Sequence, residues 1–183
     1  MKKLALLLIT LLSLNFAQAQ ALKTYFSIEE ALKKPELVYD LDLSEQDFTI
    51  FPESIGNLTK LEFLDLSENQ LTSLPESIGN LNKLEELDLS ENQLTSLSES
   101  IGNLTSLTRL YVYHNQLTSL PESIGNLNKL EELYLYGNQL TNLPESIGNL
   151  TSLTLLLLYD NQLSPEVIEK LRQALPDCRI ITD

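Results

Sequence analysis

Residue types that build most catalytic and metal sites are scarce in this sequence. Its 183 residues include one histidine, one cysteine and no tryptophan. The single cysteine, Cys178, excludes a disulfide within the chain, so the ends of the fold must be closed by packing alone. Cys178 lies in a β-prone stretch, and a free cysteine usually packs as a small buried hydrophobe. A disulfide to another chain is the alternative.

No catalytic motif offsets this scarcity. The sequence has no nucleophile elbow, no phosphate-binding loop and no HExxH zinc motif. His114 has no recognisable spacing to further zinc ligands. The pair Cys178 and His114, the one conceivable nucleophilic set, lies about three strands apart, too far for a hydrogen bond. We therefore predict that the protein is not an enzyme and has no cofactor and no metal site.

Basic residues are also few. The chain has 12 lysine and arginine residues against 26 aspartate and glutamate residues, which gives a formal net charge of −14. Nucleic acids and anionic lipids are bound through an excess of lysine and arginine, so this surface should repel both. We predict that nucleic acid is not a partner.

The longest apolar run lies at the N-terminus. Residues 1–3 (Met-Lys-Lys) precede the apolar run 4–14, and residues 17–19 (Ala-Gln-Ala) follow it. A basic start, a short apolar segment and a small-x-small exit are typical of a secretory signal peptide, and the run is too short to span a bilayer. We predict a signal peptide over residues 1–19, export, and no membrane insertion after cleavage. The mature protein would be secreted or held at the cell surface, with the periplasm as an alternative.

The rest of the chain is organised by an internal repeat. The segment 61–83 recurs every 23 residues. Further copies begin at Leu84, Leu107 and Leu130, a partial copy begins at Leu153, and a degenerate first copy begins at Val38. No residue is inserted or lost between positions 38 and 163. A strict period of this length indicates a solenoid, because one repeat cannot bury its own apolar face and several must stack.

Each copy follows the pattern L-x-x-L-x-L-x-x-N-x-L. The third copy reads Leu84-x-x-Leu87-x-Leu89-x-x-Asn92-x-Leu94. This pattern resembles the leucine-rich repeat family. The second half, L-P-x-x-I-G-x-L, is similar to the short repeats of plant-like and bacterial members, and the whole chain is similar to secreted leucine-rich repeat proteins of spirochaetes. Two positions depart from the pattern, because Gln46 replaces the motif asparagine of the first copy and Ser98 replaces the proline of the third.

The resemblance implies an α/β solenoid. It would be a right-handed superhelix with a parallel β-sheet on the concave face, short helical or 3-10 return legs, and helical caps at both ends. The residue pattern agrees, since Leu87 and Leu89 alternate with Glu86 and Asp88 and must point to opposite sides of a strand. The motif asparagine would satisfy backbone groups where the chain leaves the strand.

Both ends of such a stack need a cover. Ser27 begins a capping box, which predicts a short capping helix through Ala31 and Leu32 in the N-terminal segment, residues 20–37. The repeats fill residues 38–163 as five full copies and a partial sixth. Ser164 can cap a C-terminal helix, and residues 164–183 would add a last strand after it.

The outward positions of the strands are not fixed by the core, so their content is informative about function. They are the third, fifth, seventh and eighth residues of each repeat, and they change from acidic and serine-rich to aromatic halfway along the chain. Tyrosine offers a large contact area at a low entropic cost and is enriched in protein-binding surfaces. We name the predicted binding surface the tyrosine strip; it comprises Arg109, Tyr111, Tyr113, His114, Tyr134, Tyr136, Leu155, Leu157 and Tyr159. The acidic strip beside it comprises Asp42, Asp65, Asp88, Glu68 and Glu91.

Two classes of function fit these surfaces. The first is a secreted or surface-displayed module that binds a protein through its concave face, and the family resemblance implies host surface or matrix proteins as candidates. The second is a carbohydrate- or extracellular-matrix-binding protein whose tyrosines stack on sugars. Calcium could assist the second, because aspartates supply its preferred oxygen ligands, although carboxylates on a shallow sheet usually stay solvated. The ligand and the oligomeric state remain open.

Overall fold

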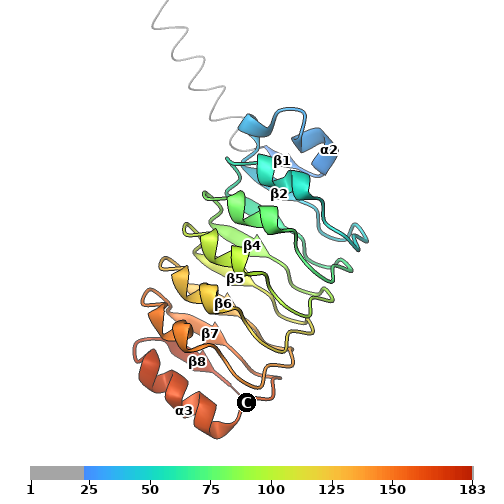
Figure 1. Cartoon of the computed structure of the whole chain (residues 1–183). Coiled ribbons are helices and arrows are strands. Elements are labelled where there is room, and N and C mark those ends of the chain that lie inside the picture. The colour runs from blue at the N-terminus through green and yellow to red at the C-terminus, as the bar shows by residue number, and fades with distance from the viewer. Residues whose placement is uncertain (1–22, 183) are drawn as a thin grey trace, which may run out of the picture.

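The repeats stack into one open sheet that is faced by a layer of short helices (Figure 1). The computed structural model describes residues 23–182. The predicted signal peptide, residues 1–19, lies outside the described residues. Within the described range, no helix is long and apolar enough to cross a membrane.

Each repeat contributes one short strand, because its leucines alternate with outward-facing side chains. The sheet has eight parallel strands that follow one another in sequence order. They are β1 (Thr24–Tyr25), β2 (Asp40–Asp42), β3 (Phe63–Asp65), β4 (Glu86–Asp88), β5 (Arg109–Tyr111), β6 (Glu132–Tyr134), β7 (Leu155–Leu157) and β8 (Arg179–Ile181). The six repeat strands and the last strand confirm the prediction, whereas β1 is an addition that the repeat pattern does not reveal.

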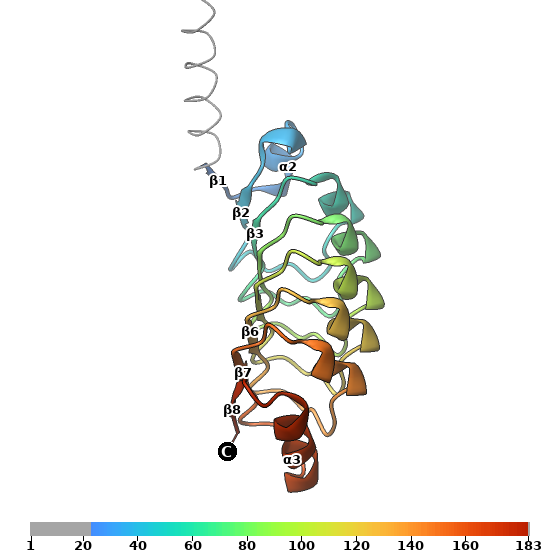
Figure 2. The ribbon, with the colours of Figure 1, turned by 90° about the vertical axis from the view of Figure 1, so that its left-hand side faces the viewer.

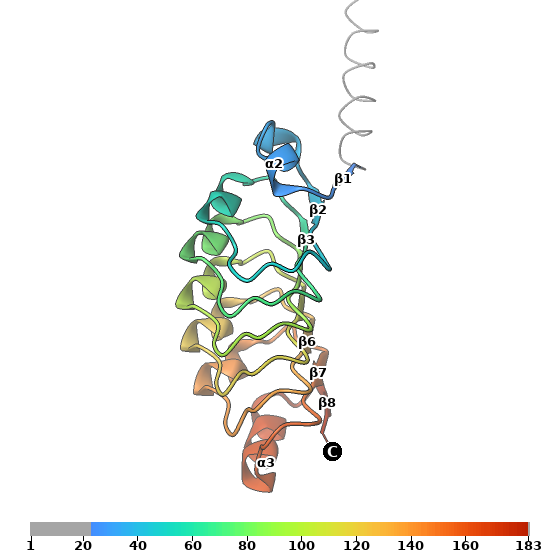
Figure 3. The same ribbon diagram turned by 90° about the vertical axis from the view of Figure 1, so that its right-hand side faces the viewer.

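The chain returns from each strand through a 3-10 turn on the opposite side of the solenoid. These turns are η2 (Glu53–Asn57), η3 (Glu76–Asn80), η4 (Glu99–Asn103), η5 (Glu122–Asn126) and η6 (Glu145–Asn149). The end segments add α2 (Ile28–Ala31), η1 (Pro35–Leu37) and α3 (Pro165–Ala174). Figures 2 and 3 show the two layers from opposite sides, with the sheet on the inner side of a shallow curve. The predicted solenoid with short return legs is confirmed.

The core lies between these two layers. In the repeat that begins at Leu84, Leu87 and Leu89 are 0% exposed on the sheet side, and Ile101 of the return leg is 1% exposed. Because the parallel register places Leu64, Leu87 and Leu110 side by side, each leucine continues a column from repeat to repeat. A central leucine therefore has another repeat on both sides.

The motif asparagines tie neighbouring repeats together. Asn115, which is 7% exposed, accepts a hydrogen bond from the backbone N–H of Leu94 at 2.9 Å. Its amide donates to the carbonyl oxygens of Leu89 and Val112, at 2.9 and 3.2 Å. Leu94 and Leu89 belong to the preceding repeat. Equivalent bonds are made by Asn69, Asn92, Asn138 and Asn161. The predicted role of these side chains is confirmed, and it extends to the repeat before their own.

This bridging explains why the first repeat can do without its asparagine. Within residues 23–182 no repeat precedes it, so an asparagine there would have no neighbouring repeat to bridge. Gln46 is exposed instead, and its amide donates to the carbonyl oxygen of Phe26 at 3.0 Å. It ties the N-terminal segment to the first repeat.

The N-terminal helix α2 begins after Ser27 and ends at Ala31, in agreement with the short helix expected within residues 20–37. Its capping residue is as expected, since the Ser27 hydroxyl accepts a hydrogen bond from the Glu30 N–H at 3.4 Å. The helix ends after one turn. Pro35 disfavours a helical conformation at the residue before it, and Lys34 accordingly has φ −146° and ψ 66°.

Strand β1 adds to the cover that the short helix α2 gives. It pairs with β2, and Tyr25 is 6% exposed at the end of the core. The Lys23 ammonium lies 4.0 Å from the centroid of the Tyr25 ring. On the concave side, the Thr24 hydroxyl donates to the Asp40 carboxylate at 2.8 Å.

The C-terminal cap contains the helix that the sequence predicts. The Ser164 hydroxyl accepts a hydrogen bond from the Val167 N–H at 3.3 Å, and Leu171 of α3 and the following Leu175 are buried in the core. Cys178 is half-buried against the core, and its burial raises the pKa of the thiol to about 11. The side chain thus behaves as the apolar packing residue that was expected.

A glycine in each return turn marks a close approach between repeats. A methyl group added to Gly102 in η4 would lie 2.5 Å from the Cβ and from the carbonyl oxygen of Ser123 in the next repeat. A methyl group added to Gly148 in η6 would lie 3.3 Å from the Cβ of Ala174 in α3. Only the first contact requires the backbone of the next repeat to move.

Gly102→Ala should therefore lower the free energy of unfolding by about 1–3 kcal/mol, as overpacking of a well-packed interior does. Urea denaturation followed by circular dichroism measures this change. Gly148→Ala is the matched control and should change stability by less than about 1 kcal/mol, since alanine also reduces the entropy of the unfolded chain. Equal losses in the two variants would contradict the close approach at Gly102.

Candidate functional site

The concave face carries the outward side chains in columns that follow the solenoid axis. Each strand contains only the third to fifth residues of its repeat, so the third and fifth side chains rise from the sheet itself. The seventh residue lies two positions beyond the end of the strand, after the inward-facing sixth residue. The eighth has a left-handed backbone, with φ between 51° at His114 and 65° at Gly137. The tyrosine strip therefore lies on adjacent repeats of one surface, with His114 in a turn at its margin.

The five tyrosines form two stacks. At the fifth position, Tyr111 and Tyr134 have ring centroids 4.9 Å apart and an interplanar angle of 20°. At the seventh position, Tyr136 lies between Tyr113 and Tyr159, at 4.5 and 4.4 Å and with angles of 6° and 14°. These distances approach the spacing of neighbouring strands, because the parallel register aligns equivalent residues. Neighbouring rings cover each other's faces, so the concave surface is lined by ring edges and hydroxyls.

Carboxylates and hydroxyls hold these rings in place. The Tyr134 hydroxyl donates to the Glu132 carboxylate at 2.8 Å, and Tyr136 shares a side-chain hydrogen bond with Tyr159. Burial raises the pKa of Tyr111 to about 12, and the nearby charge of Glu86 adds to the shift. Burial also raises the pKa of Tyr136. Tyr111 and Tyr136 thus favour their neutral form.

This preference predicts an alkaline loss of stability. Between pH 10.0, the ordinary pKa of tyrosine, and about pH 12, Tyr111 stays protonated in the folded protein and ionises in the unfolded chain. The folded state then binds more protons, so the free energy of unfolding falls as the pH rises through this window. Urea denaturation across the window measures the fall, and Tyr111→Phe should make it shallower. Identical profiles for the two proteins would contradict the shift at Tyr111.

His114 packs against the edge of the longer stack. Its ring is nearly perpendicular to those of Tyr113 and Tyr136, at 80° and 85°, with centroids 5.5 and 5.1 Å away. A Cβ atom at Gly137 would lie 2.9 Å from the His114 Cε1 atom. Glycine at position 137 therefore provides both the left-handed turn and the space for the imidazole.

Arg109 is already paired within the surface. Its guanidinium donates from Nε and Nη2 to the Glu86 carboxylate on the neighbouring strand, at 2.8 and 2.5 Å. This bond raises the pKa of Arg109. Leu155 and Leu157 are half-buried at the C-terminal end of the face. The structure thus brings the nine residues of the tyrosine strip together, but it leaves the charge of Arg109 largely neutralised.

The acidic strip is organised by hydrogen bonds within each repeat. Oδ1 of Asp88 accepts from both the backbone N–H and the hydroxyl of Ser90, at 2.8 and 2.6 Å. The pairs Asp42–Ser44 and Asp65–Ser67 repeat this arrangement. Burial raises the pKa of Asp88, although the two hydrogen bonds from Ser90 act to lower it. The negative charges of Asp65 and Glu86 also raise it. Glu68 and Glu91 are exposed in the left-handed turn beyond the strands.

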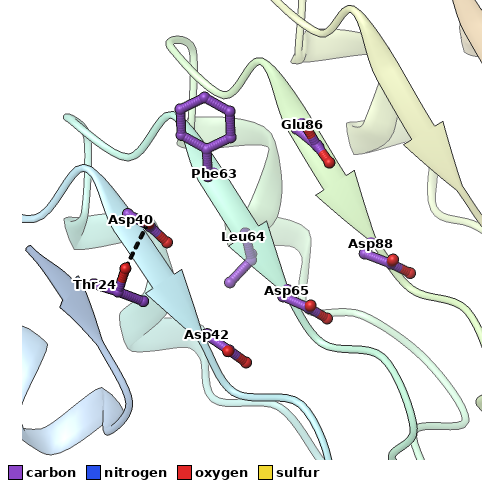
Figure 4. A pocket seen from close by; sticks show the side chains of 8 residues that line it. All are labelled: Thr24, Asp40, Asp42, Phe63, Leu64, Asp65, Glu86 and Asp88. Atoms are coloured by element: carbon purple, nitrogen blue, oxygen red, sulfur yellow. Dashed lines mark hydrogen bonds between the residues drawn. The ribbon is translucent and has the colours of Figure 1, made fainter. Parts of the chain in front are cut away.

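The acidic half of the face is hollowed (Figure 4). Thr24, Asp40, Phe63, Leu64 and Glu86 line a hollow of about 310 Å³ together with the three aspartates of the acidic strip. Phe63 is 37% exposed, so an apolar ring lies among carboxylates. Sequence reasoning did not select Asp40, Phe63 or Glu86, because only the stacking of repeats brings them to one place.

The arrangement of acidic side chains bears on metal binding. Across residues 23–182, no group of three or more histidine, cysteine, aspartate or glutamate side chains is placed to hold a metal ion. The aspartate column presents one carboxylate per strand, and Oδ1 of each carboxylate accepts hydrogen bonds from its own serine.

Two family models match the sequence. The model described as a leucine-rich repeat region matches residues 37–118, and a model of two leucine-rich repeats matches residues 105–149. The chain is a leucine-rich repeat protein. The family that the repeat pattern suggested is thereby confirmed.

Solved structures of other leucine-rich repeat proteins resemble this one. A leucine-rich repeat protein of Leptospira interrogans is 38% identical, with a TM-score of 0.73, over 82% of this chain and 39% of that protein. A plant peptide hormone receptor in complex with RGF2 is 37% identical, with a TM-score of 0.66, over 79% of this chain and 24% of the receptor. Internalin C2 of Listeria monocytogenes shares the fold at 24% identity and a TM-score of 0.67, over 82% of this chain and 64% of that one.

The leucine-rich repeat chain thus spans well under half of the Leptospira protein and of the plant receptor. No curated protein matches its sequence.

Proposed function

We propose that this protein is an exported binding module that captures a protein partner on the tyrosine strip and performs no catalysis. Family membership and the receptor complex among its solved relatives support a role in protein binding. The pattern of residues 1–19 supports export. Host surface or matrix proteins are the partner class that the resemblance to spirochaete proteins implies.

One observation carries this proposal. The fifth and seventh positions hold aspartate and serine in the first three repeats, where the two side chains close the turn with hydrogen bonds. On the same backbone, these positions become tyrosine in the fourth and fifth repeats. The fold does not require tyrosine at either position. A continuous aromatic surface that the fold does not require is best explained by contact with another molecule.

The geometry of the stacks supports a protein partner more than a glycan. A sugar packs its C–H groups against the face of an aromatic ring, and Tyr136 has both faces covered by Tyr113 and Tyr159. Ring edges and hydroxyls offer hydrogen bonds and edge-to-face contacts instead. These suit the peptide groups and aromatic side chains of a protein.

Changing Tyr134 and Tyr136 together to alanine should weaken partner binding by about 2–4 kcal/mol, because these residues lie at the centre of the strip. A panel of purified plasma and matrix proteins, with a glycan array alongside, identifies the ligand, and surface plasmon resonance then measures the loss. The matched control is Asp65→Asn on the acidic half, which should alter mainly the association rate and its salt dependence.

Three results would contradict the proposal. Binding to glycans alone, with loss of binding after calcium chelation, would favour the carbohydrate-binding alternative. Unchanged binding by the double variant would remove the tyrosine strip from the interface. The third result is self-association through the strip, which analytical ultracentrifugation tests. If the wild type is a dimer and the double variant is a monomer, the strip is an oligomer contact.

A further inference from the structure

The outward side chains of the concave face change abruptly in size and chemistry between strands β4 and β5. The register places Asp88 of β4 directly beside Tyr111 of β5. At the seventh position, Ser90 precedes Tyr113 in the same way. Short polar side chains on one strand therefore meet tall aromatic rings on the next. We call this boundary, formed by Asp88, Ser90, Tyr111 and Tyr113, the acidic–aromatic step.

The step leaves two ring faces without an aromatic neighbour. Tyr111 stacks only on Tyr134, and Tyr113 stacks only on Tyr136, both on the side away from β4. Asp88 and Ser90 are bonded to each other, at 2.6 Å between Oδ1 and the hydroxyl, which holds them low on the surface. The first ring of each stack therefore turns one face toward the acidic half. Every later interface between successive tyrosines is closed by stacking.

Carboxylates lie on the acidic side of this boundary, with Asp88 in register beside Tyr111. Glu86 and Asp65 lie close enough to Asp88 to raise the pKa of its carboxyl, which burial raises first. Arg109 donates to Glu86, and among residues 23–182 neither Asp65 nor Asp88 forms an ion pair. The hollow of about 310 Å³ begins at Asp88 and Glu86, and it provides room for a flexible aliphatic stem.

We propose that the acidic–aromatic step seats a lysine or arginine side chain of the partner, with the cation against the open faces of Tyr111 and Tyr113 and close to Asp88. A cation within about 6 Å of a tyrosine centroid is attracted by the ring, and nearby carboxylates add to that attraction. The partner is then a protein segment with a basic residue that crosses from the acidic strip to the tyrosine strip. This inference rests on the proposed function of the concave face and specifies the chemistry of the partner.

The probe is a blocked tetra-arginine peptide, and its citrulline analogue has the same shape without the charge. Isothermal titration measures affinity, and nuclear magnetic resonance follows the tyrosine ring signals. We expect the arginine peptide to bind and to shift the Tyr111 and Tyr113 rings before those of Tyr134 and Tyr159. The citrulline peptide should bind at least about tenfold more weakly, because it cannot make the cation–π contact.

Variants distinguish a specific binding site at the step from non-specific electrostatic attraction to an acidic protein. Tyr111→Leu with Tyr113→Leu should weaken tetra-arginine binding about 5- to 30-fold. Phenylalanine at both positions should restore it to within about twofold, which also shows that folding is not the cause. Glu145→Gln removes an exposed charge on η6, in the opposite layer, and should leave the affinity unchanged.

The inference is overturned if the leucine pair binds as well as the wild type, or if Glu145→Gln weakens binding as much as the leucine pair does. Calcium that displaces the peptide from the same ring signals would assign the step to a metal ion and also overturn it. These results are independent of the test of the proposed function. If Tyr134→Ala with Tyr136→Ala abolishes partner capture while the leucine pair leaves tetra-arginine binding intact, the proposed function stands and the basic seat fails.

Discussion

Replacing Leu133 with alanine is expected to lower the free energy of unfolding by about 2–5 kcal/mol. Leu133 is 0% exposed, and the register places it between Leu110 and Leu156 on the neighbouring strands. Repeats on both sides hold the surrounding side chains in place, so the cavity left by alanine cannot collapse toward an open end. Urea denaturation followed by circular dichroism gives the loss directly.

The site of this change also determines how the solenoid unfolds. Stability in a repeat array is roughly a sum of single repeats and the interfaces between neighbours. A weak interface at β6 should therefore uncouple the two halves, and amide hydrogen exchange should rise in the C-terminal repeats first because they are fewer. Leu157→Ala, on the outward face of β7, is the control and should cost about 1 kcal/mol or less. A loss below about 1 kcal/mol for Leu133→Ala would show that its column is not packed as described.

The sequence was sufficient to predict the repeat architecture because every level of the pattern agrees. Leu87 and Leu89 fix the inward side of the strand, and the unbroken period fixes the register, so a shift of one residue would expose every leucine. The role of the motif asparagine could be predicted as well, because it recurs at the same place in the unbroken period. A buried amide that recurs where the strand ends has few roles other than satisfying the backbone.

The parts that sequence reasoning missed depend on contacts between repeats or at the ends. Strand β1 has two residues and no periodicity, and its pairing with β2 depends on where the N-terminal segment lies. The outward columns could be read from the sequence, and so the five tyrosines were grouped correctly. Their stacking geometry could not be read from the sequence, because it depends on how the rings are oriented. Nor does the pattern show that Arg109 is held by Glu86 or that each aspartate is bonded to its own serine.

Replacing Asn115 with aspartate is expected to cost about 3–5 kcal/mol at neutral pH, the range seen when a buried charge is left uncompensated. The two side chains have the same shape, so packing is preserved. The amide nitrogen of Asn115 donates to the carbonyl oxygens of Leu89, Val112 and Tyr113, at 2.9, 3.2 and 3.3 Å. A carboxylate would place an acceptor against these three acceptors in a site that is 7% exposed.

The loss at Asn115→Asp should shrink as the pH falls. Burial and the facing carbonyls would raise the pKa of the new carboxyl in the folded state, so the folded protein binds the extra proton more tightly than the unfolded chain does. Once protonated, the carboxyl can donate one of the lost hydrogen bonds. Stability relative to the wild type at each pH isolates this effect from the other carboxylates. Gln46→Glu makes the same chemical change at the exposed position of the first repeat, where the side chain bridges no two repeats, and should cost less than about 1 kcal/mol. Equal costs at positions 46 and 115, or a loss at Asn115→Asp that does not depend on pH, would show that the buried asparagines do not bridge the repeats as the hydrogen bonds indicate.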